Sequence, residues 1–163
     1  MRIIKYKTEM NEEKNPILVK ETANNYPEIP SEKLTTPDKI VNLMNTVFSI
    51  ERLAEEYVWV VAVDGANHFI GLFEISHGTV NMSVINGREV FIRLLLSGAV
   101  SFFLIHNHPS GDLTPSVYDI KATKNMIDAG KIMGIKLLDH IIIGRNSFGI
   151  QYYSFARDSD IVF

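Results

Sequence analysis

Two near-continuous apolar runs constrain the fold more than any other feature of the sequence. YVWVVAV occupies residues 57–63, and VSFFLI occupies residues 100–105. Both runs have the length of a strand, are rich in β-branched and aromatic residues, and lack the alternation of a strand with one face in water. They therefore predict strands that are buried on both faces. Because such a sheet needs helices on each side, the sequence predicts an α/β fold.

Helical and strand patterns alternate along the rest of the chain. A helix-start sequence at Thr36-Pro37-Asp38 precedes apolar residues at helical spacing, which predict a helix to about Ser49. The other predicted elements are a strand at 68–76 that forms a hairpin with 57–63, helices at 88–98 and 116–133, and strands at 135–144 and 148–155. This interleaving predicts a mixed sheet between helices, which a chain of 163 residues is long enough to build.

The first 35 residues differ from this pattern. Residues 1–10 and 17–22 are β-prone runs separated by a polar, proline-containing stretch, which predicts a hairpin. The segment behind them contains several prolines and predicts a linker or wrapping arm. We therefore divide the chain into an N-terminal β-prone arm at 1–35 and a domain at 36–163. The arm is expected to pair with its own sheet or with the edge of another copy, which would give a homodimer.

Composition limits both the chemistry and the surroundings of the protein. The chain has no cysteine, so any metal must be held by imidazole and carboxylate groups. The formal net charge of −3 provides no overall attraction to nucleic acid. No apolar run approaches the ~18 residues that a membrane helix needs, and the start lacks the apolar core of a signal peptide. We expect a cytoplasmic protein without membrane association.

The stretch HNHPSGDLTPSVYD, at residues 106–119, brings metal-binding residue types to the end of a predicted strand. His106 and His108 share one side of an extended segment because side chains alternate along it. The Pro-Ser-Gly turn that follows permits a tight reversal, which returns Asp119 at the next helix start to the same point. Two imidazoles and one carboxylate are three zinc ligands, and they leave a fourth position for water, as in catalytic zinc sites.

Two further residues are predicted to act on that water and on the substrate. Glu74 ends an otherwise apolar strand and is the candidate base for a zinc-activated water; its alternative is a solvated charge at a strand end. Ser116 lies one helical turn before Asp119 and is the candidate donor to an oxyanion. The alternative for Ser116 and Asp119 is a capping box at the start of the helix.

The spacing of these five residues resembles the motif of the JAB/MPN (JAMM) zinc metalloenzymes. The stretches HGTVN, GREVF, HNHPSGD, PSVYD and LLDHIIIG are similar to the RadC-like branch of that family, and the resemblance covers roughly residues 36–157. It implies a three-layer α/β/α sandwich like that of cytidine deaminases and zinc-dependent hydrolysis of a peptide or isopeptide bond in a peptide or protein substrate. The roles that it implies are Zn²⁺ ligation by His106, His108 and Asp119, general acid/base catalysis by Glu74, and oxyanion support by Ser116.

Other functions stay open at this level. The RadC-like branch carries a traditional DNA-repair label, and lysines at 121, 124, 131 and 136 suggest DNA association or phosphodiester chemistry. No helix-hairpin-helix sequence precedes residue 36, which argues against direct DNA binding by such a segment. A non-catalytic interaction module is a further alternative, against which the intact metal motif argues. A nucleobase deaminase is rejected because its zinc motif requires cysteine.

Asp139-His140 is a polar pair that precedes the apolar run IIIG. We interpret the pair as a local structural contact. The alternative is a hydrogen bond from one of its members to a metal ligand.

Overall fold

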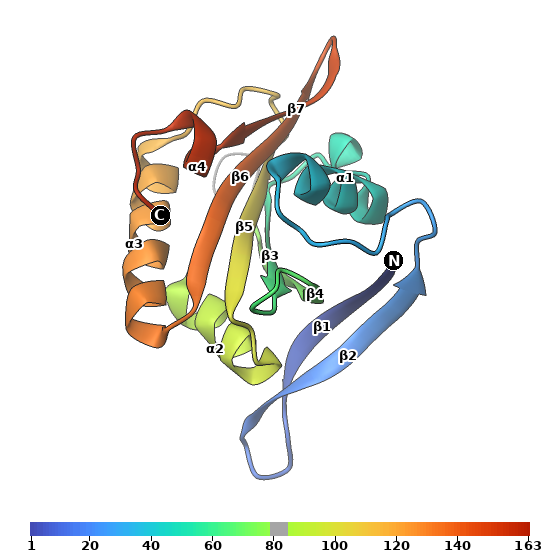
Figure 1. Cartoon of the computed structure of the whole chain (residues 1–163), viewed down its shortest axis with the longest axis vertical. Coiled ribbons are helices and arrows are strands. Elements are labelled where there is room, and N and C mark those ends of the chain that lie inside the picture. The colour runs from blue at the N-terminus through green and yellow to red at the C-terminus, as the bar shows by residue number, and fades with distance from the viewer. Residues whose placement is uncertain (79–84) are drawn as a thin grey trace.

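The computed structural model of the chain is described here for residues 1–78 and 85–163, so the last three residues of the HGTVN stretch lie outside the described residues (Figure 1). Seven strands form one sheet in the order β2-β1-β4-β3-β5-β6-β7. The strands are β1 (Arg2–Met10), β2 (Pro16–Asn25), β3 (Tyr57–Val63), β4 (Phe69–His77), β5 (Ser101–His108), β6 (Lys136–Asn146) and β7 (Gly149–Ser154). The helices are α1 (Pro37–Phe48), α2 (Gly87–Ser97), α3 (Val117–Met133) and α4 (Phe155–Asp158), with a 3-10 helix η1 at Ile50–Arg52.

Helices cover the sheet on both faces, as the apolar runs predict (Figure 1). Helix α1 lies on one face, over a core that includes Trp59 and Ile105; we call this the α1 face. Helices α2 and α3 lie on the other face, over a core that includes Val58 and Leu104, which we call the α3 face. The predicted α/β class with a mixed sheet is therefore confirmed. Among the described residues, no helix is both long and apolar enough to cross a membrane.

The central strand β5 is paired on both sides. It runs antiparallel to β3, with Val58 opposite His106, and parallel to β6, with His106 opposite Ile142. All residues from Ser101 to Asn107 are buried. Because the two histidines belong to this strand instead of following it, their backbone is fixed by the sheet and not by a loop.

The N-terminal hairpin forms, and it extends the main sheet of its own chain. Strand β1 pairs antiparallel with β2 and parallel with β4, where Tyr6 lies opposite Phe73. The segment behind the hairpin wraps onto the α1 face, where Ile29 and Leu34 are buried. The chain therefore uses the first of the two pairings expected for the arm, whereas the domain boundary and the homodimer stay predictions.

Asp139 ties the end of the sheet together from a buried position, with 3% of its surface exposed. Its Oδ2 accepts a hydrogen bond from Ser154 Oγ at 2.6 Å, and its Oδ1 accepts one from the Ala156 amide at 2.9 Å. Burial raises the pKa of the Asp139 carboxyl, and the two hydrogen bonds oppose that rise.

The raised pKa predicts a pH dependence that Asp139→Asn should remove. A carboxyl whose pKa is higher in the folded protein makes stability fall as the pH rises from the ordinary value of 3.8 through the folded value. The unfolding free energy of the variant, minus that of the parent, should therefore increase between pH 4 and pH 7. Urea titrations at both pH values measure this difference, and a difference that stays constant or decreases would contradict the assignment.

Candidate metal centre

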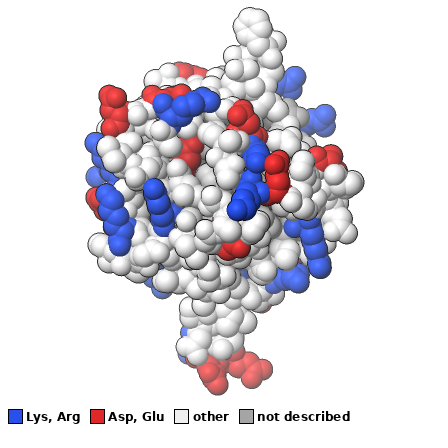
Figure 2. All heavy atoms as spheres, in the orientation of Figure 1, with Lys and Arg blue, Asp and Glu red and all other residues white. Residues whose placement is uncertain are grey.

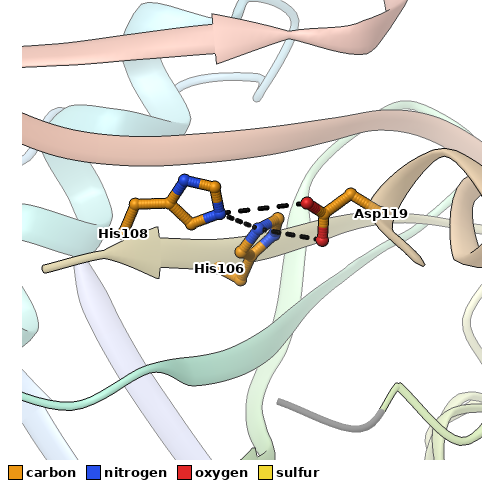
Figure 3. A group of neighbouring side chains, drawn as sticks. All are labelled: His106, His108 and Asp119. Atoms are coloured by element: carbon orange, nitrogen blue, oxygen red, sulfur yellow. Dashed lines mark hydrogen bonds and ion pairs between the residues drawn. The ribbon is translucent and has the colours of Figure 1, made fainter. Parts of the chain in front are cut away.

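Three side chains from two elements converge at the end of β5 (Figure 3). His106 and His108 come from β5, and Asp119 comes from the first turn of α3. One ligand atom from each lies within 4.8 Å of those of the other two. The structure therefore brings together all three residues that the sequence predicts as metal ligands.

The distances between these atoms suit a tetrahedral ion. The two Nε2 atoms of His106 and His108 lie 3.0 Å apart, and His106 Nε2 lies 3.3 Å from Asp119 Oδ1. The second carboxylate oxygen, Oδ2, lies 3.9 Å from His108 Nε2. For zinc bound at about 2.1 Å, tetrahedral geometry places neighbouring ligand atoms roughly 3.4 Å apart. Nitrogen and oxygen donors at this spacing fit Zn²⁺.

His108 is oriented by a backbone carbonyl. Its Nδ1 lies 2.6 Å from the carbonyl oxygen of Asp112. A carbonyl only accepts, so Nδ1 carries the proton and the Nε2 atom of the neutral ring carries a lone pair. The unprotonated nitrogen is therefore the one that faces His106 and Asp119, which is the tautomer that a metal ligand needs.

His106 is the buried member of the group, with 1% of its surface exposed. Burial lowers the pKa of His106 to about 4, an effect that the Asp119 charge opposes and that His108 reinforces. The ring is therefore neutral at neutral pH and can serve as a ligand. Its Nδ1 contacts His140 Nε2 at 2.8 Å on the side away from the group.

Asp119 and Ser116 also form the capping box that was the alternative reading. Ser116 Oγ accepts a hydrogen bond from the Asp119 amide at 3.1 Å, and Asp119 Oδ2 accepts one from the Ser116 amide at 2.7 Å. Cap and ligand are compatible because Oδ1 faces His106 while Oδ2 holds the helix start. Ser116 is exposed, and its hydroxyl proton is not used by the cap.

Comparison with known proteins identifies the group to which the fold and site belong. The sequence model of the RadC-like JAB domain matches residues 34–160. The chain belongs to the RadC-like JAB domain family. One relative is the UPF0758 protein TTE0897 of Caldanaerobacter subterraneus subsp. tengcongensis, which is 42% identical over 111 residues, or 68% of this chain and 47% of the relative.

A second relative is the UPF0758 protein GSU0386 of Geobacter sulfurreducens, which is 39% identical over 120 residues, or 74% of this chain and 52% of the relative. The chain spans about half the length of the curated relatives that it matches. The names of these relatives state no activity and no substrate.

Within this RadC-like JAB domain, Glu74 does not lie with the metal group. A one-residue bulge separates the pairs Val58 with Ser76 and Trp59 with Glu74. Glu74 is thus in register with Trp59, which belongs to the α1 face, whereas His106 is in register with Val58 of the α3 face. Its side chain is exposed. Burial raises the pKa of Tyr57, and the charges of Glu55 and Glu74 reinforce that rise. The acid/base role of Glu74 stays a prediction.

Another glutamate, Glu56, lies on the same face of the sheet as the metal group. It immediately precedes β3 and is half-buried. Because β3 and β5 are antiparallel with Val58 opposite His106, the register continued by two residues sets Glu56 beside His108. Side-chain alternation along an extended segment puts residue 56 on the same face as Val58 and His106. Sequence reasoning missed this residue, although an acid just before a buried strand was a visible signal.

Asn107 holds the Glu56 segment against β5. Its Oδ1 accepts a hydrogen bond from the Tyr57 amide at 2.8 Å, and its Nδ2 donates one to the Glu55 carbonyl at 2.9 Å. Asn107 is buried, with 1% of its surface exposed. The amide therefore holds the residues on both sides of Glu56, so the residue between the two candidate metal ligands positions the strand beside them.

The loop between β5 and α3 depends on Gly111. Its φ is +78°, and a Cβ at this position would lie 2.2 Å from the carbonyl oxygen of Arg145. The close approach lets the next residue, Asp112, present its carbonyl to His108. A side chain at residue 111 must displace this loop.

We predict that Gly111→Ala displaces the Asp112 carbonyl and weakens Zn²⁺ binding about tenfold, because the orientation of His108 is lost. Gly98→Ala is the matched control, since Gly98 also has positive φ (+70°) but has nothing within 4 Å of the added Cβ. The control should lose only about 1 kcal/mol of stability and keep its affinity for zinc. Zinc titration by calorimetry, with urea unfolding, compares the two; equal affinities would contradict the prediction.

Proposed function

We propose that this RadC-like JAB domain is a zinc-dependent hydrolase that cleaves a peptide or isopeptide bond with a metal-activated water. One observation carries the proposal: two imidazole Nε2 atoms 3.0 Å apart face a carboxylate oxygen at the end of a buried strand. Three protein ligands of this kind are typical of catalytic zinc sites, whereas structural sites use four. Membership of the RadC-like JAB family supports the same conclusion.

His106, His108 and Asp119 would hold the ion. Bound Zn²⁺ would supply Lewis-acid chemistry, which activates a water and polarises the scissile carbonyl. A cytoplasmic location is part of the proposal.

In place of Glu74, the residue predicted from the sequence, we assign the acid/base step to Glu56, which lies opposite His108 when the β3–β5 register is continued. Its carboxylate would accept a proton from the attacking water as the water oxygen bonds to the carbonyl carbon. It would then deliver that proton to the leaving nitrogen as the carbon–nitrogen bond breaks. The Ser116 hydroxyl, whose proton the capping box leaves unused, would donate to the oxyanion.

A protein or peptide substrate is favoured over DNA by the distribution of charge. On the face in Figure 2, Lys and Arg side chains are interspersed with Asp and Glu. The net charge of −3 provides no compensating attraction for phosphates. Neither feature supplies the clustered basic surface that a nucleic-acid site needs.

The metal assignment is tested by zinc content and turnover. The purified protein should bind one zinc per chain, and His106→Ala should lose both the metal and the activity. Metal content is measured by atomic emission, and hydrolysis is assayed on peptide, isopeptide and DNA substrates. A parent protein that takes up no zinc after chelation and reloading would overturn the proposal, and cleavage of DNA alone would replace the substrate class.

The acid/base assignment is tested by the matched pair Glu56→Gln and Glu74→Gln. Both variants keep the shape of the side chain and remove its charge. We expect Glu56→Gln to retain zinc and to lose activity by about 10²–10⁴-fold, because a general acid/base contributes that much. Glu74→Gln should retain both zinc and activity. The reverse result would return the role to Glu74.

A further inference from the structure

A buried series of hydrogen bonds lies behind His106, and we call it the His106 network. His140 of β6 and Thr123 of α3 are both fully buried. His106 Nδ1 contacts His140 Nε2 at 2.8 Å, and His140 Nδ1 contacts Thr123 Oγ1 at 2.7 Å. Thr123 Oγ1 donates to the Asp119 carbonyl at 2.7 Å. The His106 network thus begins at one candidate ligand, His106, and ends on the backbone of another, Asp119.

The donor and the acceptor of every hydrogen bond in the His106 network follow from the Asp119 carbonyl at its end. The Asp119 carbonyl only accepts, so it takes the single hydroxyl proton of Thr123. Thr123 Oγ1 must then accept from His140, which puts the His140 proton on Nδ1. The Nε2 atom of a neutral His140 carries a lone pair and accepts from His106 Nδ1. His106 is left with an unprotonated Nε2, which is the atom that faces His108 and Asp119.

We propose that Thr123 and His140 are positioning residues that fix His106 in the tautomer with an unprotonated Nε2 and so set the affinity of the site for zinc. This inference rests on the proposed metal function and extends it to two residues outside the group of candidate ligands. It replaces the interpretation of His140 as a purely structural residue. Partners behind a metal-binding histidine commonly change metal affinity 10- to 100-fold when they are removed.

The His106 network also connects two candidate ligands that belong to different elements. His106 belongs to β5, whereas Asp119 and Thr123 belong to α3, one helical turn apart. His140 lies on β6 between them and stacks on Phe155, with ring centroids 4.8 Å apart and planes inclined by 6°. The stacked ring cannot rotate without disturbing the core. The His106 network therefore fixes the ring of His106 relative to α3, the helix that supplies the Asp119 carboxylate.

The test uses Thr123→Val and Thr123→Ser in the full chain. Valine has the shape of threonine without its hydroxyl, so it leaves His140 Nδ1 unpaired and removes the reason for its protonation. Serine keeps the hydroxyl. Thr46→Val in α1, on the other face of the sheet, is the control for the same substitution away from the site.

Two measurements decide the outcome. In metal-free protein, long-range ¹⁵N–¹H NMR should show His106 protonated at Nδ1 in the parent, Thr123→Ser and Thr46→Val, and a mixture of tautomers in Thr123→Val. Zinc affinity from competition with a chelator should fall 10- to 100-fold in Thr123→Val and return to within a few-fold of the parent in Thr123→Ser.

The results separate this inference from the proposed function. A parent protein with His106 protonated at Nε2 would overturn this inference even if the protein binds zinc. A Thr123→Val variant with lower stability but unchanged tautomer and affinity would also overturn it, since Thr123 would then be structural only. Conversely, a parent protein that shows the expected tautomer but binds no zinc would refute the proposed function. The assignment of the donors and acceptors in the His106 network would still hold.

Discussion

Two imidazole nitrogens face each other across 3.0 Å at the end of β5, and the other features of the site depend on holding them there. If both carry lone pairs, they repel in the absence of a cation, so the backbone and the groups behind the rings must supply the restraint. Pairing of β5 on both sides supplies the first part. The Asp112 carbonyl and the His140 ring supply the second, one for each histidine.

Much of the fold could be predicted because local patterns were strong. The runs at 57–63 and 100–105 became β3 and most of β5, and the helix starts at Pro37 and Val117 lie where the capping residues indicate. The three candidate metal ligands came together because a two-residue spacing on a strand and a helix start after a tight turn are local geometry. The contact of β1 with β4 could not be predicted in the same way, because it joins segments that are distant in the sequence.

The face on which Glu74 lies shows where sequence reasoning stops. Strand alternation says which residues share a face, but not which face is which until the pairing is known. The bulge between the pairs Val58 with Ser76 and Trp59 with Glu74 adds one residue to β4 and changes the parity. No residue in that stretch announces the bulge. Glu56 precedes β3 with no bulge between it and Val58, so its register with β5 follows directly.

Buried polar residues were the least predictable part of the site. Asn107, Thr123 and His140 each look like a polar interruption of an apolar pattern, and sequence alone could not say what each one contacts. The structure gives all three partners on other elements: Asn107 binds the segment before β3, and Thr123 and His140 bind each other behind His106. A buried polar group that lacks a partner costs stability, so each of these contacts is itself a constraint on the fold.

The residues around the candidate site differ in burial on its two sides. The described contacts behind His106 are with His140 of β6 and, through it, Thr123 of α3, and both are buried. The first turn of α3 is instead exposed at Val117 and Tyr118, with 79% and 74% of their surfaces in solvent. Ser116, at the start of that turn, is exposed as well, so the hydroxyl that we propose as the oxyanion donor is in contact with solvent. The proposed function requires an acid/base group on the α3 face near the end of β5, where the candidate ligands lie. Glu56 meets that requirement by its register with β5, and Asn107 fixes both of its neighbours. The residue between the two candidate ligands therefore positions the candidate acid/base group.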